Sequence, residues 1–107
     1  MRFNTALLHS AKLGDENTGA TLTPIYQSSA FYQPSAEQHE KLFHNKATGY
    51  SYTRINNPTI AAFEERMTNL EKGVGSVACS SGMAALTNAL LNIVGAGGEI
   101  VSSTGLY

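Results

Sequence analysis

The sequence has one cysteine, three prolines and no tryptophan among its 107 residues, and only 14% of them are charged. A single cysteine, Cys79, cannot form an internal disulfide. The net charge of -1 gives no electrostatic reason to expect a nucleic-acid or membrane partner. No apolar run approaches the roughly 20 residues of a transmembrane helix, and residues 1–16 lack the apolar core and cleavage site of a signal peptide. These absences predict a cytoplasmic protein.

The remaining composition is that of an ordinary globular chain, with 42% apolar residues and ten glycines. A chain of this length buries roughly 65% of its unfolded surface. Its last residues, VSSTGLY, follow directly on an apolar β-type run that has too few neighbouring strands to pair with. We therefore expect the chain to be a piece of a longer protein.

The first 49 residues have no sustained hydrophobic period. Short helices are expected around Ala6–Leu8 and over Ala36–Phe43, and GDENTG at 14–19 is typical of a polar turn. LTPIYQSSAFY at 22–32 predicts an extended segment that lies on something else. Because this stretch is too poor in apolar residues to form its own core, we expect it to pack on another domain or subunit.

A clear helix is predicted after residue 56. Asn57 is a good N-cap and Pro58 suits the first helical position. Gly73 is placed to end the helix. The apolar residues between them recur at the spacing of one helix face: Ile60, Phe63, Met67 and Leu70.

The rest of the chain predicts a strand, a helix and a second strand. Residues 74–79 are small and apolar enough for a buried strand. From Gly82, apolar residues continue at helical spacing to Ile93, and residues 99–103 form the second expected strand. Helix, strand, helix and strand with short glycine links are typical of the beginning of a parallel α/β sheet.

The segment Ser80-Ser81-Gly82-Met83 joins the first predicted strand to the second helix. The first backbone N–H groups of a helix lack internal partners and carry a partial positive charge. Glycine allows an anion to approach them and the hydroxyls add donors, so this junction is a candidate phosphate site. The alternative is that Ser81 only caps the helix.

A second candidate anion site lies in GYSYTRINNPT at 49–59. The planar guanidinium of Arg54 suits bidentate binding of a phosphate or carboxylate. Tyr52 points the same way as Arg54 if the segment is extended. The alternative is a surface salt bridge with stacked aromatic rings.

Three other patterns favour ordinary structural roles. Residues 73–78 fit the dinucleotide-binding pattern of glycines, but these glycines precede the predicted strand instead of following it. His39 and His44 are five residues apart and share no helix face, so we expect no metal site. Cys79, with no histidine nearby in sequence, is expected to pack in the core.

Taken in order, YSYTRINNPT, SVACSSGMAAL and EIVSSTGLY resemble the Cys/Met-metabolism enzymes that depend on pyridoxal phosphate (PLP). The resemblance extends over nearly the whole chain and includes TPIYQSSAF near the start. Within the family, YTRINNPT with FEERMTNLEKG and the ending IVSSTGLY are most similar to the O-acetylhomoserine sulfhydrylases.

The resemblance implies a role for each matching position. Tyr52 and Arg54 match the pair that binds the cofactor phosphate in a neighbouring subunit. Gly82 and Met83, with Ser81 beside them, match the group that holds the same phosphate from within the subunit. Tyr107 matches the tyrosine that stacks on the pyridine ring and assists proton transfer.

The resemblance also implies the fold class, α/β, at the start of the fold-type I PLP-dependent large domain. Residues 1–56 would be an N-terminal arm for subunit contact and residues 57–107 the beginning of the cofactor domain, in a homo-oligomer. The lysine that forms a Schiff base with PLP lies beyond residue 107 in this family, so the 107 residues alone are expected to be inactive.

The implied reaction of the whole enzyme is γ-replacement on an O-acylhomoserine with sulfide or a thiol, giving homocysteine or methionine. The alternatives within the family are cystathionine γ-synthase, cystathionine γ-lyase and methionine γ-lyase. From other classes, a non-catalytic anion-binding module or an oligomerisation arm also stays open.

Overall fold

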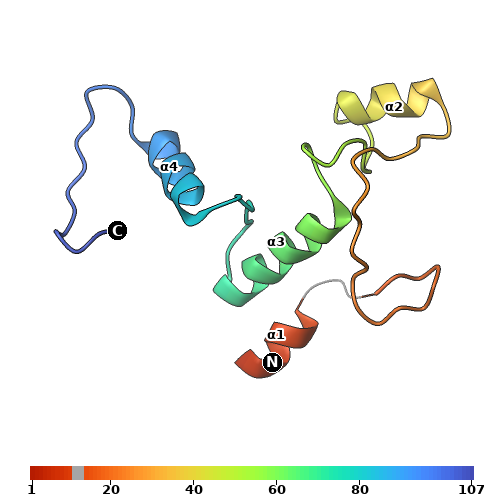
Figure 1. Cartoon of the computed structure of the whole chain (residues 1–107), viewed down its shortest axis with the longest axis horizontal. Helices are drawn as coiled ribbons and strands as arrows, with labels where there is room; N and C mark the ends of the chain where they lie inside the picture. Colours follow the sequence, from red (N-terminus) through yellow and green to blue (C-terminus); the bar gives the residue numbers. More distant parts are fainter. Residues whose placement is uncertain (11–13) are drawn as a thin grey trace. The chain divides into compact units, whose positions relative to one another are not determined.

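The computed structural model describes residues 1–10 and 14–107 and contains four α-helices (Figure 1). The helices are α1 (Phe3–His9), α2 (Ala36–Phe43), α3 (Pro58–Glu71) and α4 (Gly82–Ile93). The chain divides into two compact units, Met1–Val77 and Ala78–Tyr107. The predicted arm and domain boundary at 56/57 describes the organisation of a whole enzyme and stays a prediction.

The helix that Asn57 was expected to cap is present as α3. The Asn57 side chain accepts a hydrogen bond from the Thr59 backbone N–H at 2.8 Å. At the other end, Lys72 and not Gly73 takes the left-handed conformation, with φ 54°. The Gly73 N–H then donates to the Thr68 carbonyl at 2.9 Å, which closes the helix in a Schellman-type turn.

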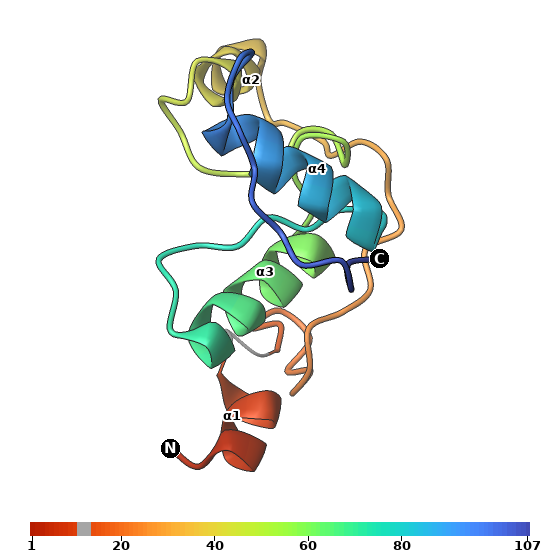
Figure 2. The same ribbon diagram turned by 90° about the vertical axis from the view of Figure 1, so that its left-hand side faces the viewer.

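The short helices predicted in the first part of the chain are both present. α1 lies beside the C-terminal end of α3 in both views, and the Asn69 side-chain amide donates to the Ser10 carbonyl (Figures 1 and 2). α2 begins after Ser35, whose hydroxyl accepts from the Gln38 N–H at 3.1 Å. Neither helix has a buried residue, and a side chain caps the N-terminus of α2 but not that of α1.

The polar turn predicted over 14–19 is also present. The carbonyl of Ala20 accepts from the Asp15 N–H at 3.0 Å, and the Asp15 carboxylate accepts from the Thr18 hydroxyl at 2.8 Å. The hydrogen bond from Thr18, followed by that from the Asn17 N–H, holds the pKa of Asp15 below its ordinary value of 3.8.

Replacing Asp15 with Asn should remove a small, pH-dependent contribution to stability. Because the folded-state pKa of Asp15 is lowered, its contribution is present above pH 3.8 and is lost as the pH falls through the folded pKa. We expect wild type and Asp15→Asn to differ at neutral pH and to converge in acid. Urea unfolding at a series of pH values measures this difference, and a constant difference would contradict it.

The two predicted strands are not formed. Residues 74–79 and 99–103 have no ladder partner, and residues 1–10 and 14–107 contain only two isolated bridges, Asp15 with Ala20 and Ala30 with Tyr52. A strand is stabilised by hydrogen bonds to a neighbouring strand. The apolar side chains at Val74, Val77 and Val101 are correspondingly exposed, and Cys79, expected in the core, is only half-buried.

Candidate functional site

Tyr52 and Arg54 lie in a turn, so the extended backbone on which their shared direction was conditional is not formed. The Tyr52 carbonyl accepts hydrogen bonds from the N–H groups of Ile55 and Asn56, at 2.9 and 3.0 Å. The two side chains nevertheless meet, because the Arg54 guanidinium carbon lies 5.3 Å from the centre of the Tyr52 ring. This is the geometry of a cation–π contact.

Hydrogen bonds join this turn to the TPIYQSSAF segment, residues 23–31. The Phe31 N–H donates to the Ser51 carbonyl at 3.0 Å, and the Thr53 N–H donates to the Ser29 carbonyl at 2.9 Å. The Thr53 hydroxyl adds a bond to the Ser28 carbonyl. Two stretches that are 20 or more residues apart in sequence therefore fix the position of Arg54.

Asn57 joins the turn to the start of α3 and is the buried polar residue of this region, with 3% of its surface exposed. Its Nδ2 donates to the Tyr26 carbonyl and to the Thr53 hydroxyl, both at 3.0 Å, while its Oδ1 caps α3. The next residue but one, Thr59, accepts from the Tyr26 N–H at 2.9 Å. The sequence predicted the cap but not these long-range bonds.

Arg54 is available for a ligand. It is exposed, and within the described residues neither of the two salt bridges involves it. The predicted alternative of a surface salt bridge is therefore not formed there, although the predicted stacking on an aromatic ring is. A guanidinium held by an aromatic face keeps its donors in one plane for a carboxylate or phosphate.

Ser81, Gly82 and Met83 form the N-terminus of α4, as predicted. The Ser81 hydroxyl accepts from the Ala84 N–H at 3.1 Å, and the Ser81 carbonyl accepts from the Ala85 N–H at 3.1 Å. Ser81 is thus a helix cap, as the alternative interpretation held. Within the part of the chain that the structure describes, no acceptor is recorded for the N–H groups of Gly82 and Met83.

The backbone around Gly82 is open. A Cβ built on Gly82 would meet no atom within 4 Å, so the backbone is open to an approaching anion. Ser81 in its cap uses its hydroxyl as an acceptor, which leaves its proton to donate. Two free amides, a hydroxyl and a helix N-terminus are the donor set of an anion site.

Tyr107 makes no packing contact that would place it over a cofactor ring. Its side chain is fully exposed, at 104% of the reference area. Tyr52 and Arg54 belong to the Met1–Val77 unit, whereas Ser81, Gly82, Met83 and Tyr107 belong to the Ala78–Tyr107 unit. The structure therefore brings Tyr52 together with Arg54, and Ser81 together with Gly82 and Met83, but it does not bring Tyr107 to either group.

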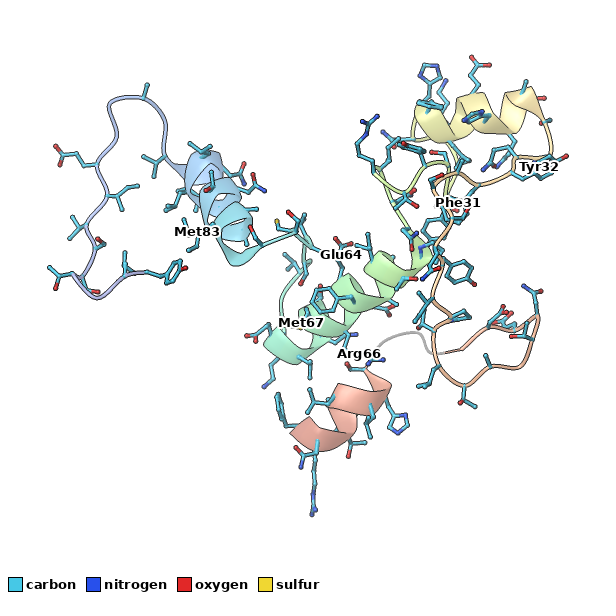
Figure 3. The ribbon with its side chains drawn as sticks, in the orientation of Figure 1. Phe31, Tyr32, Glu64, Arg66, Met67 and Met83 are labelled. Atoms are coloured by element: carbon cyan, nitrogen blue, oxygen red, sulfur yellow. The ribbon has the colours of Figure 1, made fainter. Side chains whose placement is uncertain are left out.

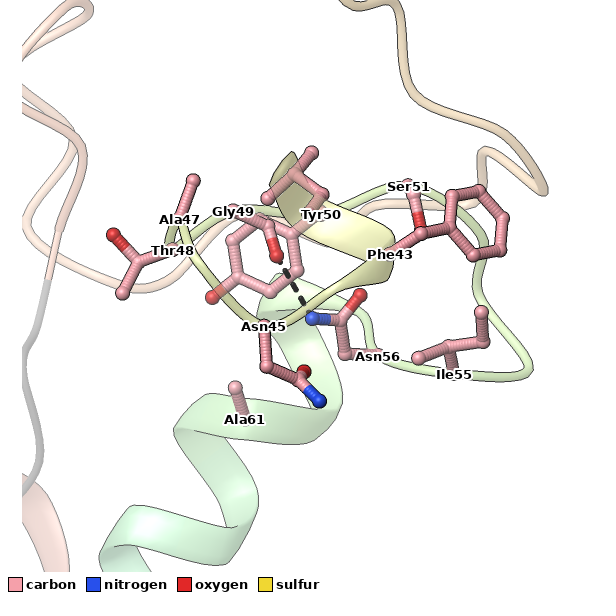
Figure 4. A pocket seen from close by; sticks show the side chains of 11 residues that line it. Phe43, Asn45, Ala47, Thr48, Gly49, Tyr50, Ser51, Ile55, Asn56 and Ala61 are labelled. Atoms are coloured by element: carbon pink, nitrogen blue, oxygen red, sulfur yellow. Dashed lines mark hydrogen bonds between the residues drawn. The ribbon is translucent and has the colours of Figure 1, made fainter. Parts of the chain in front are cut away.

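A cavity of about 740 Å³ lies beside the Tyr52 turn and was not predicted (Figure 4). Asn56 crosses it and donates to the Gly49 carbonyl at 2.8 Å, while its Oδ1 is buried without a partner. Its lining comes from the end of α2, the following loop and the first turn of α3: Leu42, Phe43, Asn45, Ala47, Thr48, Gly49, Tyr50, Ser51, Ile55, Asn56 and Ala61. No periodic pattern in the sequence marks this loop.

Among residues 1–10 and 14–107, no group of three or more His, Cys, Asp or Glu side chains is arranged to hold a metal ion. In the same ranges, every helix is too short or too polar to cross a lipid bilayer.

Comparison with curated proteins gives relatives with named activities. The chain is 48% identical over 105 residues to the O-acetyl-L-homoserine sulfhydrylase of Corynebacterium glutamicum, covering 98% of this chain and 24% of that protein. It is 42% identical over 107 residues to the cystathionine gamma-lyase of Bacillus subtilis, covering 100% of this chain and 26% of that protein. The chain thus spans about a quarter of the length of these relatives.

Comparison with solved structures gives the same class of protein. A putative O-acetylhomoserine (thiol)-lyase from Campylobacter jejuni matches with a TM-score of 0.78 and 32% identity, over 86% of this chain and 23% of that one. That structure contains N'-pyridoxyl-lysine-5'-monophosphate. The expected fold class, the start of a fold-type I PLP-dependent α/β domain, is confirmed by such matches.

The model of the family of Cys/Met metabolism PLP-dependent enzymes matches residues 4–107, almost the entire chain. This match agrees with the order of the three motifs. The chain belongs to the Cys/Met metabolism PLP-dependent enzymes.

Proposed function

We propose that the two halves of the site bind the phosphate of PLP from two copies of the chain. The N–H groups of Gly82 and Met83 and the hydroxyl of Ser81 bind it from one copy, and Tyr52 and Arg54 bind it from the other. Support comes from the two amides without an acceptor and from the Arg54 guanidinium without a carboxylate partner in the described residues. Each half supplies donors that suit an anion.

Replacing Gly82 with alanine should separate cofactor binding from folding. The added Cβ meets no atom within 4 Å, so we expect the free energy of unfolding to change by less than about 0.5 kcal/mol. The same methyl group would occupy the space through which the phosphate approaches, and we expect PLP affinity to fall by about tenfold or more. Urea unfolding and PLP titration measure the two effects; unchanged PLP affinity would contradict the proposed site.

In the same proposal, Tyr107 stacks on the pyridine ring and assists proton transfer at the substrate. Its full exposure leaves the phenol face free for such a contact. An offset stack of this kind contributes about 0.5–1.5 kcal/mol. When bound, PLP supplies the electron sink that stabilises negative charge on the substrate carbons.

The whole protein that we propose is a cytoplasmic homo-oligomer in which residues 1–56 contact a neighbouring subunit. The exposed apolar side chains of this stretch support an interface, among them Ile25, Tyr32, Phe43 and Ile55. Residues 57–107 would begin the cofactor-binding domain. A shared phosphate site makes this oligomer a requirement for cofactor binding.

The reaction that we propose is γ-replacement on O-acetylhomoserine. The Cγ–O bond of the substrate breaks and releases acetate, and a Cγ–S bond forms with sulfide or a thiol, giving homocysteine or methionine. The observation that carries this choice is the 48% identity to an O-acetyl-L-homoserine sulfhydrylase. The family match supports the same cofactor chemistry.

The test uses the complete enzyme with O-acetyl-L-homoserine and sulfide. We expect homocysteine and acetate in equal amounts, with turnover dependent on added PLP. Absence of PLP absorbance and of bound PLP by mass in the purified protein would overturn the cofactor assignment. Bound PLP without homocysteine formation would overturn the reaction alone.

The second candidate function is γ-elimination, because the chain is also 42% identical to a cystathionine gamma-lyase. Elimination from cystathionine or methionine releases ammonia and a keto acid, whereas replacement retains the amino group. Measuring ammonia release with and without sulfide therefore distinguishes the two reactions. Cystathionine synthesis is tested by replacing sulfide with cysteine in the same assay.

A further inference from the structure

Arg66 is half-buried and has no hydrogen-bond or ion-pair partner among residues 1–10 and 14–107. It lies in the third turn of α3, and its Nε is buried and makes no hydrogen bond. Neither salt bridge of the described residues includes it. Glu64 lies on the opposite side of α3 from Arg66 (Figure 3). A separation of two residues corresponds to a rotation of about 200° around the helix axis.

The buried Nε of Arg66 is unfavourable unless a hydrogen-bond acceptor binds it. Arg is protonated at all ordinary pH values, and its five N–H groups can only donate. A buried donor that has lost water and gained no acceptor reduces stability. An acceptor with negative charge would satisfy both the charge and the buried donor.

A cavity of about 290 Å³ lies next to Arg66. Thr59, Ala62 and Arg66 line it from one face of α3, where residues at spacings of three, four and seven lie together. Leu22 and Thr23, from the chain that leads to Pro24, close the other side. The Thr59 hydroxyl donates to the Pro24 carbonyl at 3.3 Å, which holds the two walls in place.

We propose that this cavity binds a small oxyanion, a phosphate or a carboxylate group, through the guanidinium of Arg66. The volume is below that of cavities for larger organic ligands, and it suits one such group. The guanidinium provides parallel donors in the geometry that these anions accept. The Thr59 hydroxyl is already bonded to Tyr26 and Pro24, so Arg66 is the principal ligand.

The site is separate from the proposed PLP phosphate site. Arg54 lies in the turn before α3 and stacks on Tyr52, whereas Arg66 lies two turns into the helix. The inference therefore does not rest on the proposed function, and its test differs from that of PLP binding. Arg54 instead provides a matched control, since it is an arginine with no ion pair in the described residues.

The experiment follows the arginine Nε–Hε signals of the ¹⁵N-labelled 107-residue chain by NMR. The sequence has three arginines, Arg2, Arg54 and Arg66, and each is assigned by substitution. Inorganic phosphate is titrated in one series and acetate in another. We expect the Arg66 signal to shift and saturate in at least one series, and the better anion identifies the class of ligand.

Variants make the result decisive. The affinity of each variant is followed through the backbone amide signals of Thr59 and Ala62, which line the same cavity. Arg66→Gln should weaken binding of that anion by about tenfold or more. Arg66→Lys, which keeps the charge but not the planar set of donors, should weaken it less. Arg54→Gln should leave the Arg66 titration unchanged. An Arg66 signal that neither anion moves, or equal affinity in Arg66→Gln, overturns the proposal. If Arg66→Gln loses its helical circular dichroism, the Arg66→Lys affinity and the wild-type signal decide.

Discussion

Replacing Arg54 with glutamine in the complete enzyme should weaken PLP binding by about 10–100-fold. Charge-assisted hydrogen bonds contribute about 1.5–3 kcal/mol each. The variant loses the positive charge of the guanidinium together with its planar set of N–H donors. The fold should be unaffected, because Arg54 is exposed and no hydrogen bond of its side chain is recorded in the described residues. Titration of the apo-enzyme with PLP, followed by absorbance, measures the change.

Two variants serve as controls for Arg54. Arg54→Lys keeps the positive charge but cannot bind bidentately, so its affinity should lie between wild type and Arg54→Gln. Arg66→Gln removes an arginine of the same unit that we place at a different site, and PLP affinity should stay as in wild type. Equal PLP affinity in wild type and Arg54→Gln would contradict the proposed phosphate contact.

Asn57→Ala should be the most destabilising single substitution that we propose. It removes the N-cap of α3, worth about 0.5–2 kcal/mol. It also removes the two part-buried hydrogen bonds from Nδ2 to the Tyr26 carbonyl and the Thr53 hydroxyl, each worth about 0.5–1.5 kcal/mol. We expect a total loss of about 2–4 kcal/mol in the free energy of unfolding, measured by urea denaturation.

Asn57→Ser separates the two contributions. Serine keeps a capping oxygen but supplies no second donor, so it should recover only the cap's share of the loss. Ser81→Ala removes an exposed cap that has no long-range bonds, and we expect about 1 kcal/mol or less. A loss for Asn57→Ala no larger than that for Ser81→Ala would contradict the role of the buried amide.

The helices of this chain could be predicted because their signals are local. Asn57-Pro58 and Ser81-Gly82 mark the starts of α3 and α4, and the apolar spacing defines their lengths. The strands at 74–79 and 99–103 were predicted by the same local reasoning and are absent from the described residues. A strand forms only where a neighbouring strand provides hydrogen-bond partners. The composition of one segment does not show whether such a neighbour is present.

The candidate site was predictable in its residues but not in its local geometry. Tyr52 and Arg54 would point the same way on an extended backbone, but the structure brings the Arg54 guanidinium to the Tyr52 ring in a turn. The turn depends on bonds from Ser28, Ser29 and Phe31, which lie 20 or more residues earlier. Contacts over this separation leave no periodic signal in a single sequence.

The contact between Arg54 and the Tyr52 ring has a consequence for the thermodynamics of binding. A free arginine side chain loses about 0.5–1.5 kcal/mol of rotamer entropy when a ligand immobilises it. In this chain the ring already restricts the guanidinium, 5.3 Å from its centre, before any anion arrives. Part of the ordering is therefore completed during folding, and the side chain meets its ligand preorganised. Tyr52 would in this way raise the affinity of Arg54 for an anion through a smaller entropy loss.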